Sequence, residues 1–329
     1  MEKDPDFSSA NLILFPAVNG NWLKSSRQYF KYAFSNRQVQ LDILHFSVPR
    51  FYPFFWLFPA KKFVCTFHAA GDITAEKDSF IFSREIYNLT AKIFYRKLHG
   101  IIAVSDFARI EISTVYGIPK NRISVMHVGT DDIWKFKPND RKHDVGGRYL
   151  VVVIGRWQKF KNVQLVAKAL ALADPYDLER YFFIFVGKKI SSNVEVIEQQ
   201  LNLVKSSFYK TIDYLTDEDY AAIIMEADLV IVPSLNEGFC HPIFDAFSLG
   251  TKVLFHAPSP AGEILAGRKG VFAADLRTPE NLLNLIGKAI EDAEGNYLEN
   301  RNYLESIEAT WDSLATNYVN LYRKLVNKI

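Results

Sequence analysis

Cysteine is scarce in this chain of 329 residues: only Cys65 and Cys240 occur, and they are far apart in the sequence. Two cysteines cannot build a disulfide framework in a chain of this length, and no CxxC pair gives the spacing of a zinc site. The first ten residues, MEKDPDFSSA, also lack the apolar segment of a secretory signal. We therefore expect reduced thiols and a cytoplasmic protein.

Long apolar runs are absent as well. The longest, Phe51 to Ala60, is interrupted by Pro53 and Pro59 and is well short of the roughly 20 residues that a membrane-spanning helix needs. Its six aromatic residues leave two placements open. They are either buried under a sheet or form an exposed patch that touches a lipid-linked molecule, which would place the protein peripherally at the inner face of a membrane.

Charge of one sign does not dominate, because the formal net charge is +2. Such a balance argues against a broad nucleic-acid-binding surface, so we expect no nucleic-acid partner. No GxGxxG follows a predicted strand, which argues against a dinucleotide dehydrogenase. No group of His, Cys, Asp and Glu has metal-ligand spacing, and we expect no metal.

What the chain does have is a regular alternation of short apolar runs and helical patterns. The runs are nearly continuous, as in parallel strands that are covered on both faces. The alternation predicts α/β architecture with doubly wound parallel sheets. The candidate strands are 11–17, 41–46, 62–68, 100–105 and 123–128, followed by 148–155, 181–187, 228–234 and 251–257.

The pattern occurs twice, with a polar break at residues 135–148 that is rich in Gly, Pro and Asp. We therefore predict a first domain over 1–140 and a second over 141–310. Residues 311–329 have the apolar spacing of an amphipathic helix. Two doubly wound domains that face each other would leave a cleft, a common place for small-molecule sites.

One segment of the second domain, PSLNEGFCHPIFDAFSLG (233–250), has the makings of an anion site. A turn of Gly238, Phe239 and Cys240 precedes a helix that we expect to begin at Pro242. Amides at a helix N-terminus suit a diphosphate. Glu237 and Asp245 flank this turn, and carboxylates accept hydrogen bonds from sugar and ribose hydroxyls. Each acid alone is also explained as a solvated turn residue or a helix-dipole residue.

Two cations follow the apolar run that ends at Gly155. Arg156 and Lys161 lie within six residues of it, where parallel strands present their ligand-binding edge. A guanidinium fork and an ammonium can clamp a diphosphate without a metal. Taken alone, they could equally be ordinary surface cations.

Together, Arg156, Lys161 and the spacing Glu237-x7-Asp245 resemble the retaining glycosyltransferases of family 4, the group 1 family, which have the GT-B fold. The family usually has Glu where this chain has Asp245, and Gly is commoner at the position of Cys240. The resemblance covers most of the chain and is weak before about Lys61. It implies two Rossmann-like domains facing across a cleft, with a C-terminal helix that crosses back to the first domain.

The resemblance also implies roles. The first domain would bind the acceptor and the second the nucleotide-sugar donor. Arg156 and Lys161 would hold the diphosphate, Glu237 the hydroxyls of the sugar and Asp245 the ribose. Backbone of Gly238, Phe239 and Cys240 would meet phosphate or sugar oxygens. The remaining assignments are His68 beside the transferred sugar, Gly20 in the loop after the first strand, and Gly187, Tyr214 and Leu215 near the base.

The expected reaction is retaining and metal-independent, with His68, Arg156, Lys161 and Glu237 as the catalytic set. A hexose would pass from a UDP-glucose-like or GDP-mannose-like donor, a co-substrate and not a cofactor, to a saccharide or lipid-linked saccharide in polysaccharide or glycan biosynthesis. No carboxylate nucleophile stands out, so we favour front-face attack. A sugar-nucleotide epimerase or hydrolase on the same frame and a degenerate sugar-nucleotide-binding subunit remain alternatives.

Overall fold

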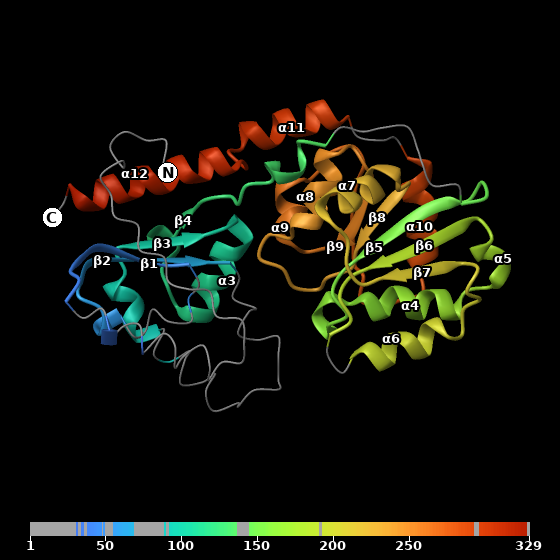
Figure 1. The fold of residues 1–329 in the computed structure, drawn as a ribbon, viewed down its shortest axis with the longest axis horizontal. Coiled ribbons are helices and arrows are strands. Elements are labelled where there is room, and N and C mark those ends of the chain that lie inside the picture. The colour runs from blue at the N-terminus through green and yellow to red at the C-terminus, as the bar shows by residue number, and fades with distance from the viewer. Residues whose placement is uncertain are drawn as a thin grey trace. The chain divides into compact units, whose positions relative to one another are not determined.

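The computed structural model describes residues 38–47, 55–68, 92–136, 145–190, 193–292 and 296–327, with the isolated positions 31, 34, 35, 49 and 89. The candidate strand 11–17, Gly20 and the first half of the aromatic run lie outside the described residues. The chain divides into two compact units (Figure 1). Unit 1 comprises residues 1–126 and 312–329, and unit 2 comprises residues 127–311.

Unit 1 contains a parallel sheet with the strand order β1-β2-β3-β4. The strands are β1 (Leu41–Phe46), β2 (Ala60–Phe67), β3 (Gly100–Ala103) and β4 (Ser124–Val125). Helix α3 (Asp106–Tyr116) begins at a Ser105 cap, whose hydroxyl oxygen accepts a hydrogen bond from the Ala108 amide at 3.0 Å. It ends at Gly117, which has a φ of 66°. Two 3-10 turns complete the described elements of this unit: η4 (Tyr95–Lys97) lies between β2 and β3, and η5 (Lys120–Arg122) lies between α3 and β4.

The C-terminal helix α12 (Trp311–Val326) packs on the sheet of unit 1. Leu325 forms a buried cluster with Val64 and Ile102, and the rings of Tyr318 and Tyr322 pack against that cluster. The amphipathic pattern at the end of the sequence therefore buries its apolar face on strands from the start of the chain. This is the return of the last helix that the fold prediction expected.

Unit 2 contains a parallel sheet with the strand order β10-β9-β8-β5-β6-β7. The central strands are β5 (Tyr149–Ile154), β6 (Tyr181–Val186), β8 (Leu229–Val232) and β9 (Val253–His256), all from the predicted runs. The edge strands β7 (Tyr209–Ile212) and β10 (Val271–Ala274) were not predicted. Their side chains are largely half-exposed, so neither strand shows the continuous apolar run of a buried one.

Helices cover both faces of this sheet (Figure 1). On one face, α4 (Val163–Leu172), α6 (Asn193–Leu201) and α10 (Leu282–Glu291) share a buried apolar core with β5, β6 and β8. Helices α7 (Asp217–Glu226) and α8 (His241–Ser248) lie on the other face. The remaining described elements of unit 2 are η6 (Asp131–Ile133), η7 (Lys159–Lys161), α5 (Pro175–Leu178), α9 (Pro260–Ile264) and α11 (Tyr297–Ser306).

The described part of the aromatic run, residues 55–58, is neither wholly buried nor wholly exposed. Phe58 is 6% exposed, whereas Trp56 is 64% exposed. Phe55 packs edge-on against Phe63 and Phe94. Both placements of the run therefore remain open. Within the described part of the chain, no helix combines the length and apolar character needed to cross a bilayer.

Candidate functional site

Three of the predicted residues of unit 2 follow the two strands at which the strand order of the sheet reverses. From β5 the chain adds β6 and β7 on one side and then returns to place β8 on the other side of β5. In open parallel sheets, ligands bind beyond the carboxyl ends of the strands at such a switch point. Arg156 and Lys161 follow β5, and Glu237 follows β8, so these residues flank the switch.

The loops after β5 and β8 are joined directly. The Leu235 amide donates a hydrogen bond to the Phe160 carbonyl at 3.0 Å. Lys161, the residue after Phe160, forms an ion pair between its ammonium and the Glu237 carboxylate. Each of these two side chains is 16% exposed. The structure thus brings together two residues that the sequence analysis assigned to different parts of one ligand. Arg156, just beyond β5, is exposed.

The loops after β5 and β6 also lie against each other. A Cβ atom on Gly187 would lie 2.0 Å from the Gly155 carbonyl oxygen, so only glycine fits at this position. The Trp157 amide donates to the Lys188 carbonyl at 3.1 Å. Gly187 therefore lies beside the start of the cation-bearing loop. Tyr214, which is 81% exposed, and the half-buried Leu215 follow β7, the next strand along the same edge.

The turn before α8 adopts the backbone shape that the sequence suggested, with one correction. Helix α8 begins at His241, and Pro242 lies in its first turn instead of starting it. Cys240 has a φ of 76°, a conformation that glycine adopts most easily. That conformation accounts for the commoner glycine at this position in the family. The Ile243 amide donates to the Cys240 carbonyl at 3.1 Å, which closes the first turn of the helix.

Packing fixes this turn in place. The Phe239 ring stacks on Phe244 with centroids 4.1 Å apart, and Phe239 is 5% exposed. Burial raises the pKa of the Cys240 thiol well above its ordinary value, and the neighbouring Glu237 carboxylate raises it further. Cys240 is therefore a neutral thiol beside the Lys161–Glu237 pair.

Asp245 lies in α8 and points to α7, where the Tyr220 hydroxyl donates to its carboxylate at 3.0 Å. Burial raises the pKa of Asp245 to about 7, the Tyr220 hydrogen bond lowers it, and the Asp132 charge raises it. Neither Tyr220 nor Asp132 was predicted from the sequence. Tyr220 sits in the polar first turn DEDY of α7, where nothing local marks it as a partner of a buried acid.

In unit 1, His68 follows β2 directly and is exposed. Its Nε2 donates to the carbonyl of Ser47 at 3.0 Å, just after the neighbouring strand β1. This bond leaves Nδ1 as the acceptor of the neutral ring. Gly20, the other candidate of this unit, lies outside the described residues.

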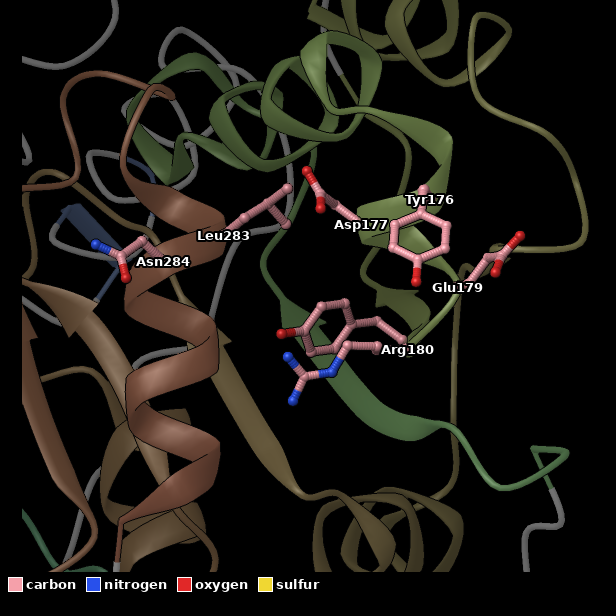
Figure 2. A pocket seen from close by; sticks show the side chains of 7 residues that line it. Tyr176, Asp177, Glu179, Arg180, Leu283 and Asn284 are labelled. Atoms are coloured by element: carbon pink, nitrogen blue, oxygen red, sulfur yellow. The ribbon is translucent and has the colours of Figure 1, made fainter.

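A different hollow occurs at the opposite end of the unit 2 sheet (Figure 2). Its volume is about 470 Å³. Because Tyr181 begins β6, the hollow lies at the amino ends of the strands, away from Lys161 and Glu237, and none of the predicted residues lines it. Its lining consists of Tyr176, Asp177, Glu179, Arg180, Tyr181, Leu283 and Asn284. Within the described ranges, no group of three or more His, Cys, Asp or Glu side chains is arranged to hold a metal ion.

Family comparisons match almost the whole chain. The family described as "Glycosyl transferases group 1" matches residues 135–306, a little over half of the chain. The family described as "Glycosyltransferase Family 4" matches residues 3–133. The first of these matches includes the Lys161–Glu237 pair and the α8 turn.

Individual relatives are distant. The chain is 22% identical to O-antigen chain mannosyltransferase B of Escherichia coli over 268 residues, which are 77% of this chain and 70% of that protein. It is 24% identical to MMP α-(1→4)-mannosyltransferase of Mycolicibacterium hassiacum over 239 residues, 71% of this chain and 56% of that protein. Further curated relatives are matched over little more than half of their length.

Solved structures share the fold at low identity. Sucrose-phosphate synthase from Thermosynechococcus elongatus superposes with a TM-score of 0.75 at 17% identity, covering 93% of this chain and 79% of that chain. Anabaena Alr3699/HepE in complex with UDP gives a TM-score of 0.64 at 17% identity, with 92% and 81% covered. The predicted class, two Rossmann-like domains of the GT-B type, is confirmed, and with the family match it shows that this chain belongs to the group 1 glycosyl transferases.

Proposed function

We propose that this chain is a retaining, metal-independent glycosyltransferase that moves a hexose from a nucleotide diphosphate sugar to a saccharide or lipid-linked saccharide. The observation that carries the proposal is the Lys161–Glu237 ion pair at the switch point of the unit 2 sheet. A cation for the diphosphate and an acceptor for sugar hydroxyls lie side by side there. Helix α8 begins at His241, four residues after Glu237.

The charges suit the departure of a diphosphate. Negative charge develops on the leaving group as the bond to the sugar breaks, and preorganised positive groups stabilise it most effectively in a partly desolvated site. Lys161 is 16% exposed, Arg156 lies nearby in the same loop, and the amides of Phe239 and Cys240, in the turn before α8, add partial positive charge. Three sources of positive potential support transfer without a metal ion.

The names of relatives support the class of donor. Anabaena Alr3699/HepE has been solved in complex with UDP-glucose, and two curated relatives are mannosyltransferases. For this chain, we propose a UDP-glucose-like or GDP-mannose-like donor. The remaining roles extend the same scheme: Asp245 binds the ribose, Gly187, Tyr214 and Leu215 bind the base, and His68 and Gly20 act on the donor sugar and phosphate.

The ion pair also supports front-face attack. Glu237 is engaged by Lys161, which suits an acceptor of sugar hydroxyls better than a carboxylate nucleophile. In the proposed step, the bond between the anomeric carbon and the β-phosphate oxygen breaks. The acceptor oxygen bonds to the same face of that carbon, and its proton passes to a phosphate oxygen.

The test compares two lysines of one loop. We expect Lys161→Ala to lower turnover by about 10²-fold or more, because it removes a contact to the leaving group. Lys159→Ala is the matched control, since Lys159 is exposed in the same turn η7, and we expect near-parental turnover. The measurement is transfer of labelled hexose from UDP-glucose and GDP-mannose, chosen after a thermal-shift panel of nucleotide sugars.

Three outcomes would count against parts of the proposal. Near-parental turnover in Lys161→Ala would exclude the clamp. Release of free sugar in place of transfer would favour a hydrolase. An inverted anomeric configuration in the product, read by NMR, would exclude retention.

A further inference from the structure

Asn162 stands at the first position before helix α4 but does not behave as a helix cap. An Asn at this position normally accepts a hydrogen bond from a backbone amide of the first helical turn. Here the side chain makes no such bond. Asn162 is 5% exposed and has a φ of 56°, a conformation that costs energy for most residues but less for Asn. The side chain must therefore serve another contact.

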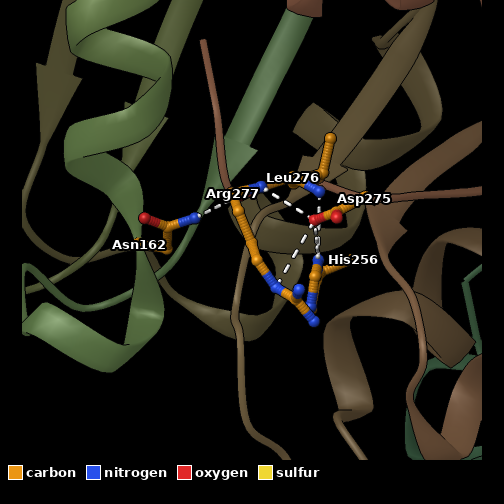
Figure 3. Close-up of polar contacts among 5 residues, drawn as sticks. All are labelled: Asn162, His256, Asp275, Leu276 and Arg277. Carbon is orange, nitrogen blue, oxygen red and sulfur yellow. Dashed lines mark hydrogen bonds and ion pairs between the residues drawn. The ribbon is translucent and has the colours of Figure 1, made fainter.

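That contact is a hydrogen bond to the backbone just after the edge strand β10, which we call the brace (Figure 3). Asn162 Nδ2 donates to the Leu276 carbonyl at 2.8 Å in a buried setting. Leu276 follows β10 at the edge of the sheet. Its amide donates to Nδ1 of His256 at 3.0 Å, and His256, the last residue of β9, is 4% exposed. The Leu276 peptide is thus held at its amide by His256 and at its carbonyl by Asn162.

The brace fixes the backbone beside Lys161. On one side of Lys161, the Phe160 carbonyl accepts the Leu235 amide. On the other side, Asn162 is tied to Leu276. A lysine side chain loses considerable rotamer freedom when it is held in one geometry, so fixing both of its sequence neighbours reduces the number of places that its ammonium can reach. The loops after β5, β8, β9 and β10 all contribute to this arrangement.

We propose that Asn162 is a positioning residue for Lys161: its side-chain amide, braced on the Leu276 peptide, holds the Lys161 ammonium where the donor diphosphate binds. The inference rests on the proposed function, because it assumes that Lys161 meets a diphosphate. Asn162 itself touches no reacting atom in this scheme.

The test is a double-mutant cycle with UDP and GDP as the ligands. Asn162→Gly removes the brace but tolerates the positive φ. We expect it to weaken binding of the nucleoside diphosphate by about tenfold, as the loss of an aligned charge-assisted contact does. In the Lys161→Ala background, Asn162→Gly should change binding by less than about twofold, since the residue acts only through Lys161. A merely structural role would weaken binding equally in both backgrounds.

A matched variant and a second substitution keep the test decisive. Gln164→Ala removes the hydrogen bonds from Gln164 Nε2 to Asn162 Oδ1 (3.1 Å) and to the Lys159 carbonyl (3.0 Å), and the one that Gln164 accepts from Asn193. It leaves the Leu276 brace, and we expect near-parental affinity. If Asn162→Gly does not fold, as judged by circular dichroism, Asn162→Asp takes its place in the cycle. Asp also tolerates the positive φ but opposes the Leu276 carbonyl with an oxygen.

The outcomes separate the inference from the proposed function. Two results together support both the inference and the proposed clamp. The parent chain binds the nucleotide and Lys161→Ala weakens that binding, and Asn162→Gly weakens binding only when Lys161 is present. If Lys161→Ala weakens nucleotide binding but Asn162→Gly has no effect, or has the same effect with and without Lys161, the inference alone is overturned. No binding of either nucleotide by the parent, or binding that Lys161→Ala leaves intact, overturns the proposed clamp and the inference with it.

Discussion

Asp245 shows how a single buried group sets pH dependence. Burial raises its pKa to about 7, and the Asp132 charge adds to this effect against the hydrogen bond from Tyr220. An ordinary aspartate in an unfolded chain has a pKa of about 3.9. Between these two values the folded state binds a proton that the unfolded state does not. The contribution of Asp245 to stability is therefore greatest below about pH 4 and falls as the pH rises through 7.

We predict that Asp245→Asn abolishes this dependence. The amide keeps an acceptor for the Tyr220 hydroxyl but carries no charge at any pH. A shift of about three pKa units corresponds to a free energy on the order of 4 kcal/mol. Urea unfolding at pH 5 and pH 8.5 should show a smaller loss of stability in the variant than in the parent. Asp217→Asn, an exposed change on α7, serves as the control, and equal losses in Asp245→Asn and the parent would refute the idea.

The helices and strands differ in how clearly the sequence predicts them. Helix α7 has clear local signals, because the Thr216 side chain caps it and acidic residues fill its first turn. The central strands of unit 2 were predicted because both of their faces are covered. The half-exposed edge strands β7 and β10 carry no such signal.

The contacts of the candidate site were harder to predict than its residues. Residue type and spacing were enough to select Lys161 and Glu237. Their pairing, however, requires β8 to lie next to β5, and no local pattern encodes which strands become neighbours. The same holds for the Tyr220–Asp245 bond. Asn162 was not predicted from the sequence either, because its brace to Leu276 joins residues that are 114 positions apart and leaves no local signal.

A buried polar network joins helix α12 to the sheet of unit 1. His45 Nδ1 contacts the Tyr322 hydroxyl, and His45 Nε2 lies 2.8 Å from the Thr66 hydroxyl. The Thr66 and Tyr318 hydroxyls are also hydrogen-bonded at 2.8 Å. Burial, with a smaller contribution from the nearby His68, lowers the pKa of His45 to about 4. A neutral histidine thus holds the helix through partners on β2 and α12.

The network predicts acid sensitivity of unit 1. Between pH 6.5 and 4 the folded state binds fewer protons at His45 than the unfolded state, so stability falls as the pH drops through this window. About 2.5 pKa units correspond to a free energy on the order of 3 kcal/mol. We expect His45→Gln to lose this contribution, so that the free energy of unfolding of the variant changes less with pH than that of the parent. The measurement is the urea midpoint by circular dichroism at pH 7 and pH 4.5, and a slope as steep as the parent's would contradict the prediction.

At the scale of the whole molecule, the two units differ in how the sequence builds them. Unit 1 is discontinuous, since α12 completes it from the C-terminal end of the chain. Unit 2 is one continuous stretch, residues 127–311. The ion pair of Lys161, the brace of Asn162 and the α8 turn all lie inside that stretch. Its ends are also tied together, because the Trp311 amide donates to the Asp131 carboxylate at 2.8 Å.

We therefore predict that a fragment of residues 127–311 folds cooperatively and binds the same nucleoside diphosphate as the full chain. The fragment keeps its own apolar core on the sheet, and a unit with such a core can fold alone. Calorimetric titration with UDP and GDP should give an affinity within about tenfold of the full chain, since all the residues proposed to hold the diphosphate belong to unit 2. Lys161→Ala in the fragment is the matched control and should weaken binding. A fragment that shows a cooperative unfolding transition but no nucleotide binding, while the full chain binds, would mean that unit 1 supplies an essential part of the nucleotide site.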